Sequence, residues 1–159
     1  MKIKTRIIQE TYMFLSQAKI TSLSVNDKIK VLKIVRALKP VAVEFEEYAN
    51  KAAESMKTSD DLFERYQKAQ QYEMMSKNPK CDISQLPFGP AENAAFWKEW
   101  AKYNQDVDKA LKEPGDAEKE VDFEQLSEEA FGLLIDSNNW TIGQIEALSE
   151  LIMKPIKED

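Results

Sequence analysis

Few side chains of this 159-residue chain could carry out chemistry, because it contains no His and only one Cys, Cys81. Without an imidazole the chain lacks the base of Ser-His-Asp and Cys-His catalytic sites and the Glu-x-x-His pairs of di-iron bundles. A lone Cys forms no intrachain disulfide and no Cys-based zinc site. Only four Gly residues are present, and no Walker or Gly-x-Gly-x-x-Gly loop occurs. We therefore expect no enzymatic activity, no cofactor and no metal.

One cluster of carboxylates offers a chemical alternative. The acidic ladder consists of Asp116, Glu118, Glu120, Asp122 and Glu124. On a concave surface such a ladder could collect Mg²⁺, but the calcium-loop pattern fails because Val121 stands where a sharp turn requires Gly. We interpret the ladder as a solvated or salt-bridged strand face.

Aromatic residues and the thiol offer two further alternatives. Trp97, Trp100 and Tyr103 could form a shelf for an aromatic ligand. Their three-residue spacing on an amphipathic helix favours a core or a subunit interface instead. Cys81 lies in a Pro-rich segment with only Lys80 as a flanking cation, so we interpret it as an incidental thiol.

Charge is distributed unevenly along the chain, although the net charge is −6. Residues 1–39 hold nine basic and two acidic side chains, a net charge of +7, whereas residues 40–159 hold 13 basic and 26 acidic side chains, a net charge of −13. Five of the cations fall in one short segment: Lys28, Lys30, Lys33, Arg36 and Lys39. They could pack against acidic parts of the chain itself, meet an acidic partner or bind nucleic acid. Nucleic acid is the least favoured of the three, because no aromatic residues interleave with these cations to stack bases.

The elements that must position these side chains are helices. Apolar residues at three- and four-residue spacing predict one helix over residues 5–18 and a second over residues 25–57, which begins after a cap at Ser24. The apolar stripe of the second helix includes Ile29 and Leu32 and is wide enough to contact more than one neighbour. Pro40 interrupts this helix, so we expect a kink or a register break within about one turn of it.

The middle of the chain continues this pattern. A third helix is predicted to follow the polar cluster at residues 58–61 and to end near Lys77. Residues 79–90 contain three Pro residues and predict a loop. A fourth, aromatic-rich helix is predicted over residues 91–113, where Pro114 and Gly115 end it.

Residues 119–125 alternate between charged or polar and apolar side chains, which is typical of a short strand. Two arrangements fit residues 1–5. They could begin the first helix, or Lys2, Ile3 and Lys4 could pair with residues 120–124 in a two-stranded β ribbon. In the ribbon the two Lys side chains would face the acidic ladder, and Ile3 would lie with Val121 and Phe123.

The C-terminal part predicts two short helices, over residues 128–137 and 142–153, with Ser127 and Thr141 as their N-caps. Altogether we expect a mainly α protein with a single helical domain over residues 1–159, arranged as an elongated antiparallel bundle or hairpin. Its parts are N-terminal helices over 1–78, a Pro-rich loop over 79–90, the aromatic helix over 91–113, and a strand with a C-terminal helical hairpin over 114–159.

Two groups of short motifs resemble a known class of proteins. The first group is Asn26-Asp27-Lys28, Leu38-Lys39-Pro40-Val41-Ala42 and Phe45-Glu46; the second is Leu126-Ser127-Glu128-Glu129-Ala130-Phe131 and Asn138-Asn139-Trp140-Thr141-Ile142-Gly143-Gln144. Together they resemble small uncharacterised helical proteins of bacteriophages and prophages, particularly those of gut Bacteroidetes, over about a third of the chain. The resemblance implies a phage-derived or accessory protein and carries no catalytic residues with it.

The functional expectation is a non-enzymatic interaction, assembly or accessory protein of phage or prophage origin. Its candidate interaction surface combines the five cations of residues 28–39 with Trp97, Trp100 and Tyr103. The expected partner is a protein: another copy of the chain, or a phage or host protein. The alternatives are a nucleic-acid-associated protein that uses the basic segment and, least favoured, an enzyme. No run approaches the ~20 apolar residues of a membrane span and no signal peptide is evident, so we expect a cytoplasmic or virion-associated protein without membrane or small-molecule ligands.

Overall fold

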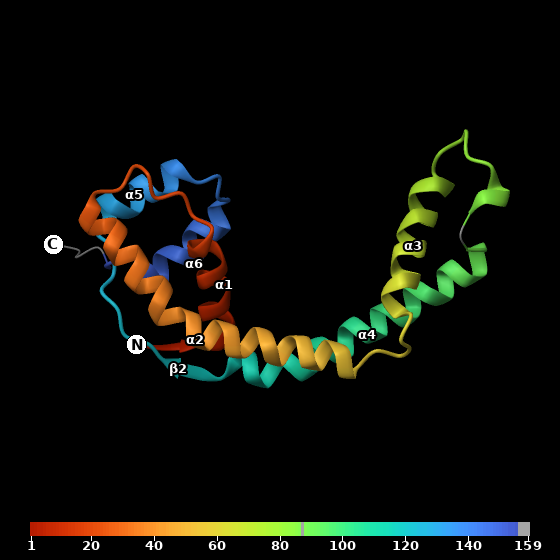
Figure 1. The fold of residues 1–159 in the computed structure, drawn as a ribbon, viewed down its shortest axis with the longest axis horizontal. Helices are drawn as coiled ribbons and strands as arrows, with labels where there is room; N and C mark the ends of the chain where they lie inside the picture. Colours follow the sequence, from red (N-terminus) through yellow and green to blue (C-terminus); the bar gives the residue numbers. More distant parts are fainter. Residues whose placement is uncertain (87, 156–159) are drawn as a thin grey trace. The chain divides into compact units, whose positions relative to one another are not determined.

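The computed structural model describes residues 1–86 and 88–155. Six α-helices and a two-stranded sheet make the described part of the chain mainly α, as predicted (Figure 1). Contacts divide the chain into two compact units. The end unit comprises Met1–Tyr48 and the described part of Pro114–Asp159, and the middle unit comprises Ala49–Glu113. The assignment of residues 1–159 to a single domain stays a prediction.

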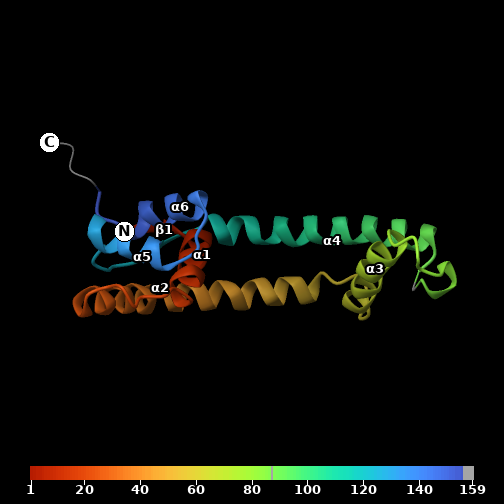
Figure 2. The same cartoon turned by 90° about the horizontal axis from the view of Figure 1, so that it is seen from above.

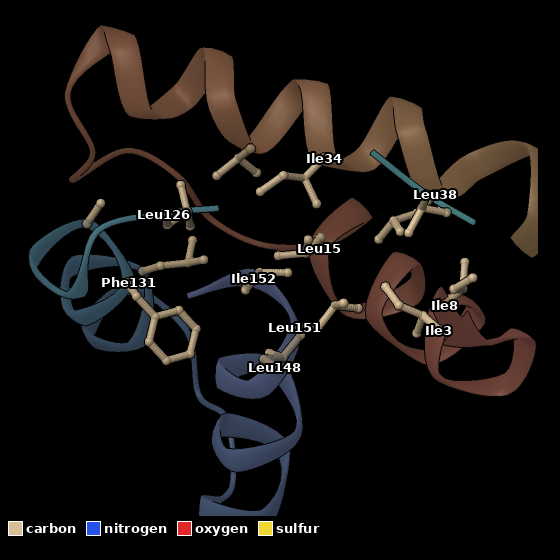
Figure 3. Packing of buried hydrophobic residues seen from close by; sticks show 14 of the residues in the cluster. Ile3, Ile8, Leu15, Ile34, Leu38, Leu126, Phe131, Leu148, Leu151 and Ile152 are labelled. Carbon is tan, nitrogen blue, oxygen red and sulfur yellow. The ribbon is translucent and has the colours of Figure 1, made fainter. Parts of the chain in front are cut away.

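The end unit is built from α1 (Thr5–Ser16), the first part of α2 (Val25–Ser55), α5 (Glu128–Ser137) and α6 (Ile142–Ile152). All these helices begin at the predicted residues and end within two residues of the predicted positions. Figure 3 shows Ile34 and Leu38 pointing from α2 into a core that α1, α5 and α6 also supply. Ile8, Leu126, Leu134 and Ile152 are completely buried in it. The two ends of the chain are thus held by one apolar core.

Helix α2 continues through Pro40 without interruption, so a register break at this residue is wrong. Figure 1 shows the ribbon of α2 changing direction in its orange part, as expected of a kink. Pro40 itself is exposed, whereas Leu38 and Ala42 on either side of it are buried in the end unit. Packing of these two side chains offsets the hydrogen bond that Pro40 cannot donate.

The β ribbon is confirmed, with a different pairing from the one predicted. Strand β1 (Lys2–Lys4) pairs antiparallel with β2 (Glu118–Glu120), so Lys2 lies opposite Glu120 and Lys4 opposite Glu118. The predicted faces hold, because Ile3 and Val121 are both buried in the core. Residues 122–124 lie beyond the ladder, contrary to the prediction.

The position of the ribbon depends on where α4 (Pro90–Asp116) ends. This helix continues for three residues beyond residue 113, where it was predicted to end. Pro114 and Gly115 form part of its last turn instead of ending it. A Cβ built on Gly115 would lie 3.4 Å from Phe45, so this turn packs closely against α2. Because the helix ends late, the chain enters the ribbon at once: Ala117 accepts hydrogen bonds from the Thr5 backbone N–H (2.9 Å) and hydroxyl (2.8 Å).

Both predicted C-terminal caps are confirmed. The Ser127 hydroxyl accepts from the Ala130 N–H at 3.2 Å, and the Thr141 hydroxyl accepts from the Gln144 N–H at 3.4 Å. The Gln144 side chain in turn accepts from the Thr141 N–H at 2.9 Å, which completes a capping box. These local bonds set the starts of α5 and α6.

The middle unit contains α3 (Leu62–Ser76), a short 3₁₀ turn at Ile83–Gln85 and most of α4. Figure 2 shows α3 beside the first part of α4. Leu62 and Ala69 of α3 and Phe96 and Tyr103 of α4 are its buried core. Pro87, in the predicted loop, lies outside the described residues.

Candidate functional site

The structure divides the five cations of the basic segment into one paired residue and four others. Lys30 is half-buried, and its Nζ lies 3.0 Å from Oε1 of Glu124 in the acidic ladder. This hydrogen bond from Lys30 lowers the pKa of Glu124 below its ordinary value. The others form no ion pair within residues 1–86 and 88–155: Lys28, Lys33, Arg36 and Lys39. Among the described residues, one of the five cations is thus paired with a carboxylate and four are not.

Three apolar side chains share the solvent-facing side of α2 with these cations. Val25, Ile29 and Leu32 are 72%, 46% and 46% exposed. Their spacing of four and three residues aligns them along one helix face, away from the buried face formed by Val31 and Ile34. Ile29 and Leu32 were assigned to the wide apolar stripe expected to contact neighbouring elements, and the structure leaves both of them exposed.

We call this surface the α2 outer face and define it by Val25, Lys28, Ile29, Leu32, Lys33 and Arg36. Lys39 lies one helical turn beyond Arg36, and the first acidic residue after Asp27 is Glu44. Asp27 itself accepts a hydrogen bond from the Ser24 hydroxyl at 2.6 Å. The face thus combines exposed apolar side chains with positive charge only, a composition typical of a surface that contacts an acidic partner.

A groove lies between α5 and α6 in the same unit, with a volume of about 650 Å³. We call it the α5–α6 groove. Its apolar lining comes from Phe131, Ile135, Ile145 and Met153. No Cβ fills the space above Gly132, where a built Cβ would meet no atom within 4 Å. The groove is therefore an apolar channel between two capped helices.

Carboxylates flank this channel. Glu128 and Glu129 line its α5 side, and a second hollow that shares Ser149 and Met153 is lined by Glu150. Glu128 and Glu129 occupy the first turn of α5, where the partial positive charge of the helix N-terminus stabilises them. None of the three carboxylates forms an ion pair with a described residue. Sequence reasoning identified the cap that starts α5 but missed the groove, which depends on how α5 packs against α6.

The aromatic residues of the candidate surface pack inside the middle unit. Tyr66 stacks on Trp100 with ring centroids 4.3 Å apart, and Trp97 meets Tyr66 edge-on at 5.8 Å. The Tyr103 hydroxyl donates to the Ala53 carbonyl at 2.8 Å, and burial raises the pKa of Tyr103. Tyr103 is buried and both Trp side chains are half-buried, so these residues serve the core of the unit.

The middle unit also contains an ion pair in which the pKa values of both partners are shifted. Arg65 donates to both carboxylate oxygens of Glu99, at 2.8 and 2.9 Å, and the Thr58 hydroxyl donates to the same carboxylate. Hydrogen bonding by Arg65 is the largest cause of the lowered pKa of Glu99, and the same pair raises the pKa of Arg65. A carboxylate held ionised by a guanidinium and a hydroxyl is suited to stabilising the fold and is a poor general base at neutral pH.

Two residues of the acidic ladder, Asp116 and Glu124, form salt bridges. Asp116 pairs with Lys4, at 3.2 Å, and with Arg6. Glu124 pairs with Lys154, at 3.6 Å, in addition to Lys30. Within residues 1–86 and 88–155, no group of three or more His, Cys, Asp or Glu side chains is placed to hold a metal ion.

Cys81 is half-buried, with its Sγ 3.6 Å from the Asp82 carbonyl oxygen.

None of the helices in the described part of the chain has the length and apolar character that crossing a membrane requires. Comparison with protein-family models, with curated proteins and with solved structures found no match.

Proposed function

We propose that this chain is a non-enzymatic protein-binding module whose α2 outer face binds an acidic amphipathic helix of a partner protein. The observation that carries the proposal is the exposure of Val25, Ile29 and Leu32 along one line of α2. Lys28, Lys33 and Arg36 flank this line, and none of them forms an ion pair with a described carboxylate. Apolar side chains four and three residues apart are the pattern by which one helix packs along another.

The chemistry of the face selects the class of partner. Burial of the apolar line supplies affinity, whereas the cations select a partner with acidic residues beside its own apolar stripe and speed the encounter. A contact of two to three helical turns is small, so binding in the micromolar range is expected.

The biological setting that we propose is an assembly or accessory role in a bacteriophage or prophage. The motifs around Pro40 and between Leu126 and Gln144 support this setting through their resemblance to small helical phage proteins. A cytoplasmic or virion-associated location is part of the same proposal. An assembly factor needs no catalytic residues, which agrees with the composition of the chain.

A titration with synthetic helical peptides tests the proposal. One fluorescent peptide carries Leu at every third or fourth position and Glu elsewhere, and a second peptide has the same composition in scrambled order. We expect the amphipathic peptide to bind, and the double substitution Ile29→Ser with Leu32→Ser to weaken binding at least tenfold. Leu133→Ser is the matched control, because Leu133 is a 36% exposed apolar residue on α5. Equal binding of both peptides, or equal effects of the two sets of substitutions, would contradict the proposal.

A second candidate function is nucleic-acid binding through the same basic segment, favoured by the four cations without a described ion-pair partner. Phosphate binding depends steeply on salt and does not require apolar contacts. Retention on DNA that falls with salt, that is lost in Lys33→Glu with Arg36→Glu and that survives Ile29→Ser with Leu32→Ser would favour this alternative over a protein partner.

A further inference from the structure

We infer that the partner of the α2 outer face is a second copy of this chain, and that the α2 outer face of one copy docks into the α5–α6 groove of the other. The inference rests on the proposed function and names its partner. Both surfaces belong to the end unit, and no residue that lines the groove comes from α2. Figure 3 shows α2 on one side of the core, with α6 on the other side of it.

The apolar parts of the two surfaces complement each other. The α2 outer face presents a ridge of Val25, Ile29 and Leu32, and the groove presents an open apolar hollow to which the half-buried Ile135 and Ile145 contribute. A helix ridge that packs between two helices is the usual way in which an amphipathic helix enters a groove. The open space above Gly132 permits close approach of a backbone.

The charges of the two surfaces are opposite. Lys28, Lys33 and Arg36 flank the ridge, and Glu128 and Glu129 flank the channel. Neither set forms an ion pair with a described residue of its own chain. Docking would therefore join two sets of charges that form no ion pairs among the described residues of one chain. It would also keep the basic α2 outer faces of the two copies apart, whereas a dimer formed by two α2 outer faces would bring their like charges together.

The geometry of this contact is head-to-tail. When one copy places its α2 outer face in the groove of a second copy, its own groove and the partner's face stay free. Contacts of this kind build rings or open chains rather than closed two-fold dimers. The small contact area predicts dissociation constants of about 10–100 µM, so assembly should appear only at high local concentration.

Sedimentation velocity of the full chain at increasing concentration tests this inference. At 50 mM NaCl we expect the average mass to rise from the 18.3 kDa of one chain beyond that of two, and to fall back at 500 mM NaCl. The face variant, Lys33→Glu with Arg36→Glu, and the groove variant, Glu128→Lys with Glu129→Lys, should each stay monomeric because like charges then meet.

Recombining the two variants is the decisive step. In an equimolar mixture each altered surface meets an oppositely charged one, so assembly should return to at least half the wild-type extent. A single chain that carries both pairs of substitutions should also assemble. Circular dichroism checks that each variant is folded. Lys51→Glu with Lys98→Glu is the matched control, since it makes the same charge change at exposed positions of the middle unit and should leave assembly unchanged.

The outcomes separate this inference from the proposed function. A wild-type chain that stays monomeric at 500 µM, variants that assemble normally, or folded variants that do not recover on mixing would each overturn self-docking. If the acidic amphipathic peptide still bound the α2 outer face, the proposed function would stand with a different partner. If the peptide failed as well, both would be wrong.

Discussion

Replacing Glu99 by Gln should destabilise the middle unit by about 1–2 kcal/mol through loss of its ion pair with Arg65. The two side chains are joined by two hydrogen bonds of 2.8 and 2.9 Å in a bidentate arrangement. They are 29% and 27% exposed, and the Thr58 hydroxyl also donates to the carboxylate. The Gln amide would keep the shape of the Glu99 side chain but not its charge. It would also offer the Arg65 guanidinium one acceptor oxygen in place of two.

The magnitude follows from the exposure and geometry of the pair. Fully exposed ion pairs contribute about 0.2–1 kcal/mol, whereas breaking a buried pair costs about 3–5 kcal/mol. The Arg65–Glu99 pair lies between these limits, because each side chain keeps more than a quarter of its surface exposed and is partly screened by solvent. Its two charge-assisted bonds place it above the usual surface pair.

Urea unfolding followed by Trp fluorescence measures the effect, because Trp97 and Trp100 lie in the core of the middle unit. A Trp140→Phe background removes the signal of the end unit. The single variants Glu99→Gln and Arg65→Met and the double variant form a double-mutant cycle, and Met retains much of the aliphatic part of the Arg side chain. We expect a coupling energy of about 1–2 kcal/mol that shrinks in 1 M NaCl. A coupling below about 0.3 kcal/mol would refute the assignment of the pair as a stabilising element.

The same pair predicts a pH dependence. The pKa of Glu99 is lowered in the folded chain, chiefly by hydrogen bonding to Arg65, so the folded state favours the ionised carboxylate. Its contribution to stability is complete above the unfolded-state pKa of about 4.3 and is lost as pH falls through the lower folded-state pKa. The difference in unfolding free energy between wild type and Glu99→Gln should therefore be constant from pH 7 to about pH 5.5 and shrink below about pH 4.5. A difference that grew on acidification would contradict this sign.

Three further changes test the end unit. Thr141→Ala should cost about 1 kcal/mol of unfolding free energy by removing the N-cap of α6, with Thr141→Ser as a control that keeps the hydroxyl. Leu126→Ala should cost about 2–5 kcal/mol, because this completely buried side chain would leave a cavity; a loss below about 1 kcal/mol in denaturant unfolding would contradict its place in the core. Lys30→Gln should return the pKa of Glu124 toward its ordinary value, measured by carboxyl-carbon NMR, and an unchanged pKa would show that Lys30 does not hold it down.

Local signals predicted the elements of this fold well. Ser127 and Thr141 each cap a helix through bonds that reach only three residues along the chain, so residue types and spacing suffice to predict them. The alternation of charged and apolar residues likewise predicted a ribbon with Lys side chains opposite Glu side chains. The paired residues differ from the prediction because the position of the ribbon depends on where α4 ends. The last turn of α4 lies close to Phe45, a residue distant in the sequence, and the spacing of residues within α4 does not predict this packing.

The helices α2 and α4 continue through Pro40 and Pro114 for the same reason. Sequence rules treat Pro as a helix breaker because it loses one hydrogen bond and crowds the preceding turn. In α2 the burial of Leu38 and Ala42 offsets the loss of stability caused by Pro40. At Pro114 the packing of the last turn of α4 offsets the corresponding loss. Neither compensation can be inferred from the helix alone, since both involve packing against residues of other elements.

The candidate site shows the corresponding limit for function. Spacing identified the apolar positions of α2 but not which of them the fold covers, because Ile29 and Val31 are equally apolar and only two residues apart. The structure covers Val31 and exposes Ile29. As a result, part of the apolar stripe of α2 is an exposed line with cations on both sides. This exposed line, together with its cations, is the feature on which the proposed contact with a partner rests.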